Sequence, residues 1–176
     1  MPWRSASRPW LLGLAWLALL LAPARSQGRA DGPEDFGRWQ SSPRQCLLQR
    51  SSTTAANPRP ERCRNVRLDQ LWPGLLTLRF SEAGVNDRLG SPQLTLAGVL
   101  QPGSRIMACR EGRCQPRWPL VLQVSALADR GLRPELGLSQ LPLAQLARGE
   151  CRFNRLGGRC RVEASDGLSW QVEVTW

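Results

Sequence analysis

The chain has 176 residues, a formal charge of +10 and no histidine, and every basic residue in it is an arginine. The absence of histidine excludes the ordinary Ser-His-Asp and Cys-His catalytic arrangements, and the six cysteines are better explained as crosslinks than as nucleophiles. Composition therefore favours a binding protein over an enzyme.

Residues 1–26 have the pattern of a secretory signal peptide. Arg4 and Arg8 precede an apolar run, and small residues, Ala24 and Ser26, stand at the expected cleavage positions. The apolar run is shorter than the roughly 20 residues that a membrane-spanning helix needs. We therefore expect cleavage after Ser26 rather than an uncleaved anchor, and a soluble, secreted, extracellular product without membrane insertion.

An even number of cysteines in a secreted chain indicates disulfides. Six cysteines permit 15 pairings, which the sequence does not separate. Short spacings favour two local bridges and leave the third pair by elimination. The predicted disulfide cysteines are Cys46 with Cys63, Cys109 with Cys114, and Cys151 with Cys160. Zinc is the alternative use of these cysteines, but their spacings are not those of zinc ribbons, so we expect no metal and no cofactor.

Residues 27–67 are rich in serine, proline, arginine and glutamine and show little apolar periodicity. A segment of this composition buries too little apolar surface to offset the entropy lost on ordering. We therefore expect an irregular arm over 27–67, followed by a single domain over 68–176. Within the arm, residues 51–54 are serines and threonines beside prolines, a candidate O-glycosylated tract with a plain loop as the alternative.

Residues 68–176 contain short apolar runs separated by turn residues. Apolar and polar residues alternate in 75–80, 93–100, 120–127 and 170–176, which is the period of half-buried strands. About seven strands at intervals of roughly 8 to 14 residues are typical of an antiparallel β-sandwich. The sequence thus predicts an all-β, disulfide-linked domain.

The segment from Leu136 to Cys151 resembles the corner before the second core cysteine of immunoglobulin-like domains. The residues at the spacings of that corner are Leu136, Leu138, Leu141, Ala147 and Cys151. The family's corner tyrosine is absent, because Gly149 stands there. The resemblance implies an immunoglobulin-like or fibronectin-like sandwich architecture. The alternative for this segment is a short helix that Ser139 begins and Gly149 ends, with Leu143 and Leu146 pointing inward.

The segment from Glu150 to Val162 is predicted to form a hairpin with its turn at Asn154 to Gly158. Strand alternation puts Arg152, Arg159 and Arg161 together on one face, opposite the cysteines. Because arginine binds sulfate and carboxylate bidentately, these three are the candidate polyanion-binding residues.

The arginine excess has two explanations. Removing Arg4, Arg8 and Arg25 with the signal segment leaves 21 basic against 14 acidic residues, a charge of +7. In a secreted protein that charge favours a sulfated glycan, not nucleic acid, as the polyanionic partner. The alternative is a GC-rich coding sequence, which produces abundant arginine, alanine, glycine and proline regardless of function.

Two pairs of carboxylates are candidates for hydrolytic chemistry, Glu82 with Asp87 and Glu163 with Asp166. Both pairs fall in predicted loops or on solvent faces beside arginines, where ordinary surface charge is expected. The sequence therefore predicts a secreted, non-enzymatic protein that binds another extracellular protein, as a ligand, decoy or adhesion module. Sulfated-glycan binding through arginine clusters is the alternative.

Overall fold

The structure, a computed structural model, describes residues 36–51, 60–82, 93–130 and 143–176. The predicted signal peptide and the tract over 52–54 lie outside these residues. All regular secondary structure in the described part is β-strand. The strands are β1 (Gly37–Ser41), β2 (Gln45–Ser51), β3 (Glu61–Arg62), β4 (Asn65–Trp72), β5 (Leu75–Ser81), β6 (Gln93–Leu100), β7 (Ala108–Arg110), β8 (Arg113–Gln115), β9 (Leu120–Arg130), β10 (Leu143–Phe153), β11 (Gly157–Ala164) and β12 (Ser169–Thr175).

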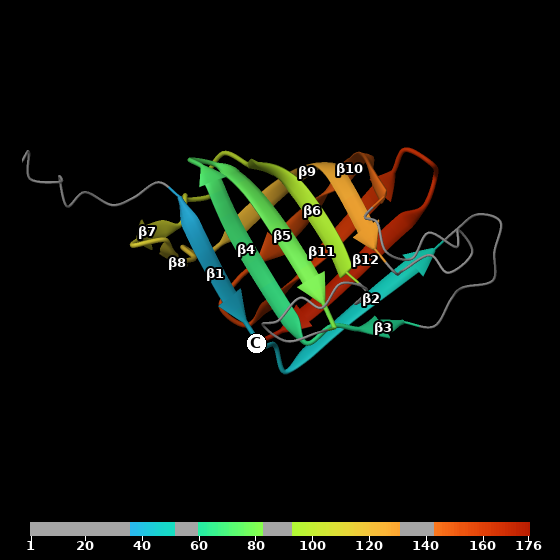
Figure 1. Cartoon of the computed structure of the whole chain (residues 1–176), viewed down its shortest axis with the longest axis horizontal. Coiled ribbons are helices and arrows are strands. Elements are labelled where there is room, and N and C mark those ends of the chain that lie inside the picture. The colour runs from blue at the N-terminus through green and yellow to red at the C-terminus, as the bar shows by residue number, and fades with distance from the viewer. Residues whose placement is uncertain (1–35, 52–59, 83–92, 131–142) are drawn as a thin grey trace, which may run out of the picture. The chain divides into compact units, whose positions relative to one another are not determined.

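The twelve strands form one hydrogen-bonded sheet in the order β3-β2-β12-β11-β10-β9-β6-β5-β4-β1-β8-β7 (Figure 1). Neighbouring strands are antiparallel except for β1 and β8, which are parallel and meet at a single residue pair. The all-β, disulfide-linked part of the prediction is confirmed. The described strands are joined in one continuous, curled sheet rather than in two separate hydrogen-bonded sheets. In this part of the chain no helix has the length and apolarity that a membrane crossing requires.

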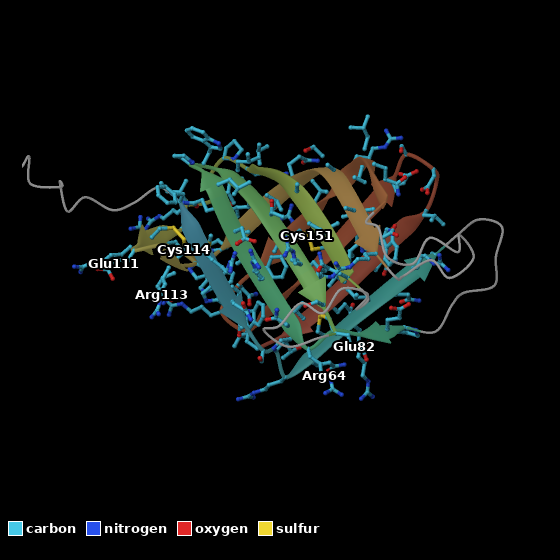
Figure 2. The ribbon with its side chains drawn as sticks, in the orientation of Figure 1. Arg64, Glu82, Glu111, Arg113, Cys114 and Cys151 are labelled. Atoms are coloured by element: carbon cyan, nitrogen blue, oxygen red, sulfur yellow. A yellow bond between two sulfur atoms is a disulfide. The ribbon has the colours of Figure 1, made fainter. Side chains whose placement is uncertain are left out.

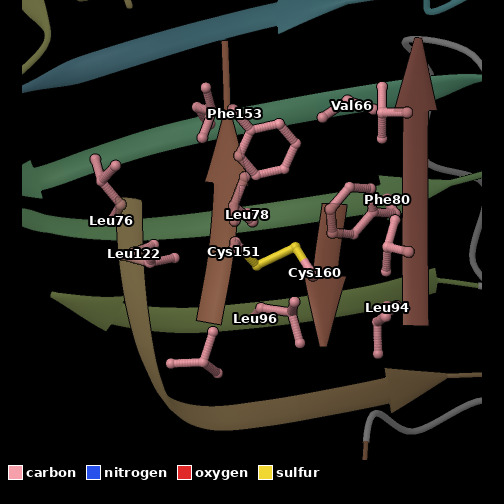
Figure 3. Close-up of a cluster of buried hydrophobic side chains, with 14 of the residues drawn as sticks. Val66, Leu76, Leu78, Phe80, Leu94, Leu96, Leu122, Cys151, Phe153 and Cys160 are labelled. Carbon is pink, nitrogen blue, oxygen red and sulfur yellow. A yellow bond between two sulfur atoms is a disulfide. The ribbon is translucent and has the colours of Figure 1, made fainter. Parts of the chain in front are cut away.

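The curled sheet surrounds a single apolar core. Alternate residues of the strands point inward, so that β5 buries Leu76, Leu78 and Phe80 while the residues between them are half-buried. Figure 3 shows Cys151 and Phe153 of β10 facing the strands that carry these side chains. Burial of alternate apolar side chains from both halves of one sheet stabilises the fold.

Two glycines allow the sheet to bend. Gly98 and Gly149 both pair with Val124, from opposite sides, and each lies at a register shift, in β6 and in β10. A Cβ on Gly98 would lie 2.0 Å from the backbone oxygen of Gln123, and one on Gly149 would lie 2.1 Å from that of Arg161. Side chains are therefore excluded at the positions where the strands bend, because bulges and glycines give a sheet its curvature.

Four aromatic rings pack together and bring β1 into contact with the residue that follows β12. The centroid of Trp176, which follows β12, lies 5.2 Å from that of Trp39 in β1 and 6.3 Å from that of Phe153. Trp118 lies 6.1 Å from Trp39. The indole Nε1 of Trp176 donates to the carbonyl oxygen of Asn154 at 3.1 Å, so this ring is fixed by a hydrogen bond and by packing.

Each disulfide joins cysteines on neighbouring segments. Cys151 and Cys160 are directly opposite each other in β10 and β11, as are Cys109 and Cys114 in β7 and β8. The third bridge joins Cys46 of β2 to the residue after β3. Because Cys151 bonds to its hairpin neighbour, the staple between sheets that an immunoglobulin-like core implies does not form.

The described part of the predicted arm, residues 36–51 and 60–67, is arranged in strands and is not irregular. Its apolar alternation is short: Cys46 and Leu48 in β2, Val66 and Leu68 in β4. These strands pair with β12 and β5, and β12 is remote in the sequence. Long-range pairing therefore supplies the order that the local pattern does not indicate.

The alternative prediction of a short helix beginning at Ser139 is wrong for the residues of that segment that the structure describes. Residues 143–153 form β10, and Leu146 pairs with Ala126 and is 75% exposed rather than inward. Gly149 adjoins a register shift within this strand and ends no helix. Pairing with β9 and β11 on both sides overrides the helical pattern.

Candidate functional site

One row of residues crosses the outer face of the sheet from β4 to β2. Strand pairing places its members directly opposite one another in the order Trp72, Leu75, Val99, Gln123, Glu150, Arg161, Gln171 and Gln49. Directly opposed residues point to the same face of a sheet, so the whole row faces away from the core. The row is apolar over β4 to β6 and polar or charged from β9 onward.

The apolar part of the row is unusually exposed. Trp72 is 69% exposed, Leu71 59% and Val99 53%. Together with the half-buried Leu75 they form a surface that we call the apolar patch. A register shift between Gln70 and Trp72 ends β4 irregularly, and Gly74, with φ 81°, supplies the turn to β5. Contiguous exposed apolar surface of this kind marks interaction sites in soluble domains.

The three arginines predicted from the hairpin lie together at the other part of the outer face. Arg152 and Arg159 are directly opposite each other in β10 and β11, and Arg161 is two residues further along β11. They line a hollow of about 640 Å³, which also contains Gln123 and Glu150. Arg152 and Arg159 also line a second hollow of about 720 Å³. We call the surface of these three residues the arginine hollow.

Acidic residues reduce the charge of the arginine hollow. The Glu150 carboxylate accepts hydrogen bonds from Nε and Nη2 of Arg152, and this contact raises the pKa of the Arg152 guanidinium. Glu150 is also directly opposite Arg161, and Glu173 is directly opposite Arg159. Neither Arg159 nor Arg161 forms an ion pair within 4.0 Å with any acidic residue that the structure describes. The hollow therefore keeps two arginines available for a ligand.

Two glutamines connect the arginine hollow to the apolar patch. The amide Nε2 of Gln101 donates to Oε1 of Gln123 at 2.8 Å and to Oε2 of Glu150 at 3.1 Å. Gln123 in turn is directly opposite Val99. The outer face is thus one continuous surface, apolar on one side and cationic on the other.

A third feature, which we call the edge groove, lies where β8 meets β1. It has a volume of about 650 Å³, and its lining residues include Phe36, Arg38, Asp69, Leu71 and Arg113. Figure 2 shows Arg113 and Glu111 projecting from the tip of the β7–β8 hairpin beside the disulfide of Cys114. Through Leu71 the groove adjoins the apolar patch.

Of the candidate hydrolytic carboxylates, Glu163 and Asp166 have partners among the described residues, and Glu82 is exposed at the end of β5. Glu163 lies 3.9 Å from Arg148 on the neighbouring strand, and Asp166 accepts a hydrogen bond from the backbone N–H of Leu168 in a turn. Asp87 lies outside the described residues. Burial raises the pKa of the Glu61 carboxyl on β3, and the charge of nearby Arg50 offsets part of this rise. Glu61 does not line the arginine hollow or the edge groove. Within the described ranges, no cluster of His, Cys, Asp or Glu has the composition of a metal site.

Sequence reasoning did not identify the apolar patch or the edge groove. Both combine residues from strands that are far apart in the chain, such as Trp72 with Val99 and Arg38 with Arg113. A tryptophan immediately before Pro73 and Gly74, at a turn, was the one local signal for an exposed ring.

Comparison with known proteins gives no match: no protein-family model, no curated protein and no solved structure is similar to the chain.

Proposed function

We propose that the protein acts outside the cell, without enzymatic activity, by binding another extracellular protein through the outer face of its sheet. A role as ligand, decoy or adhesion module fits such a surface. The pattern of a signal peptide over residues 1–26 and three disulfides support an oxidising, extracellular location.

The apolar patch is the observation that carries the proposal. Protein interfaces have an apolar, aromatic centre and a polar rim, and tryptophan and arginine contribute most to their affinity. Trp72 lies in such a centre, with Gln123 and the arginine hollow along one side. Exposed aliphatic side chains such as Leu71 and Val99 suit a protein partner better than a sulfated glycan, which binds through charge and hydrogen bonds.

A panel of extracellular domains displayed on cells tests the proposal. The chain from Gln27 onward, multimerised to increase avidity, is expected to bind at least one member saturably. The same material with reduced and alkylated disulfides, which no longer presents the outer face, is expected to bind none. Failure of the folded protein to bind any member of a comprehensive panel would count against protein recognition.

Sulfated-glycan binding is the second candidate, and the arginine hollow favours it. Because Glu150 and Glu173 face the arginines, we expect the protein to elute from heparin near physiological ionic strength. Retention well above physiological salt, lost when Arg152, Arg159 and Arg161 are all replaced with serine, would contradict this expectation and support glycan binding. The matched control replaces three exposed arginines outside the hollow, Arg105, Arg110 and Arg117, and changes the net charge equally.

A further inference from the structure

We infer that the edge groove binds an extended acidic segment of a partner protein and holds one of its carboxylates between Arg38 and Arg113. The inference rests on the proposed function and deepens it, because it gives the chemistry of the partner. The edge groove differs from the arginine hollow in its residues and in its position on the sheet.

The charges at the edge groove are unbalanced. Arg38 and Arg113 are directly opposite each other on β1 and β8, an arrangement in which like charges repel. One acidic residue is close: Oδ1 of Asp69 lies 2.9 Å from Nε of Arg38, and its Oδ2 lies 2.8 Å from Nε of Arg67. That carboxylate is shared between two arginines and forms no ion pair with the third. Arg113 forms no ion pair within 4.0 Å with any residue that the structure describes.

A second carboxylate, supplied by a ligand, would relieve this repulsion. A charge-assisted hydrogen bond to a guanidinium is about twice as strong as a neutral one, and arginine binds a carboxylate with two parallel N–H donors. On the side of Arg38 away from Asp69, beside Arg113, no carboxylate of the described residues forms an ion pair with Arg113.

The hairpin holds the backbone of Arg113 in place. Glu111, with φ 51°, and Gly112, with φ 72°, form the tight turn, and a disulfide joins the strands at the second residue pair from it, Cys109 with Cys114. The backbone N–H of Arg38 donates to the oxygen of Gly112 at 2.8 Å. Gly37 makes that approach feasible, because a Cβ there would lie 2.7 Å from the Gly112 backbone. A preorganised site loses little entropy on binding.

The apolar residues of the groove favour a peptide over a glycan. Phe36 is 58% exposed and lines the groove together with the equally exposed Leu71. The volume of about 650 Å³ is within the range of ligand-binding clefts. A segment in which acidic and apolar side chains alternate would place carboxylates at the arginines and apolar groups against Phe36 and Leu71.

Fluorescence anisotropy with a short labelled peptide, in which glutamate alternates with leucine, tests the inference. We expect saturable binding to the chain from Gln27 onward, weakened about tenfold by Arg113→Gln. The matched control is Arg117→Gln, an exposed arginine two residues after β8 that does not line the groove, and it should bind like the wild type. A peptide with glutamine in place of glutamate should not bind. Thermal unfolding of both variants should match the wild type, because both side chains are exposed.

Equal binding by Arg113→Gln, equal loss in both variants, or equal binding of the glutamine peptide would each overturn the inference. Direct binding of a labelled heparin oligosaccharide that is as tight in Phe36→Ser as in the wild type, while the peptide no longer binds to Phe36→Ser, would indicate that the groove also takes a polyanion. In that case carboxylate specificity would be wrong. If a partner found in the extracellular panel binds Arg113→Gln unchanged, the inference fails and the proposed function stands.

Discussion

Replacing Gly98 with alanine is expected to destabilise the domain by about 3 kcal/mol or more. The added Cβ would lie 2.0 Å from the backbone oxygen of Gln123 and 2.9 Å from Cα of Val124. Both atoms belong to the backbone of β9, which is paired with β6 on one side and β10 on the other. The clash therefore has no flexible side chain to absorb it, and relief requires broken strand pairing. Urea denaturation followed by circular dichroism measures the loss.

Gly103→Ala is the matched control, because it replaces a glycine where the added Cβ would meet no other atom. Gly103 has φ 90°, and a Cβ there would meet nothing within 4 Å. Its replacement should cost only the strain of a left-handed alanine, about 1 to 2 kcal/mol. A Gly98→Ala loss no larger than that of Gly103→Ala would show that the bend between β6 and β9 does not depend on glycine.

The strands with long apolar alternation are those that the sequence predicts well. In β9 and β12 the alternate residues, from Leu120 to Val124 and from Trp170 to Val174, are buried where the period of two indicates. β1 and β2 were not predicted, because each has only one or two inward apolar residues. β1 and β2 are ordered because they pair with β4 and β12, and the apolar periodicity of a strand does not indicate which strand it pairs with.

The same distinction applies to the candidate site. Arg152, Arg159 and Arg161 belong to one hairpin, so local alternation suffices to place them on one outer face. The opposition of Arg38 and Arg113 depends on a single parallel pair between β1 and β8. Glu150 and Glu173 offset the charge of Arg161 and Arg159 because the strand register places them directly opposite, and the sequence alone does not give that register.

The continuity of the outer face is a property of the topology. β6 pairs with β9 rather than with β7 or β8, which brings Val99 opposite Gln123 and thereby joins the apolar patch to the arginine hollow. The β7–β8 hairpin instead crosses to β1 at the edge of the sheet. If each strand paired only with the next one in the sequence, β6 would not lie beside β9, and the apolar patch and the arginine hollow would be separated.

The affinity of the double variant Trp72→Ser, Val99→Ser for a partner found in the extracellular panel tests the central claim most directly. Surface plasmon resonance should show a loss of roughly 100-fold, since each truncation at the centre of an interface costs about 1 to 2 kcal/mol or more. Both side chains are more than half exposed, so the unfolding temperature should stay near that of the wild type. The matched control, Leu146→Ser, removes a leucine that is 75% exposed and lies outside the apolar patch and both hollows, and it should bind normally. Unchanged affinity of the patch variant, or an equal loss in the control, would contradict recognition through this face.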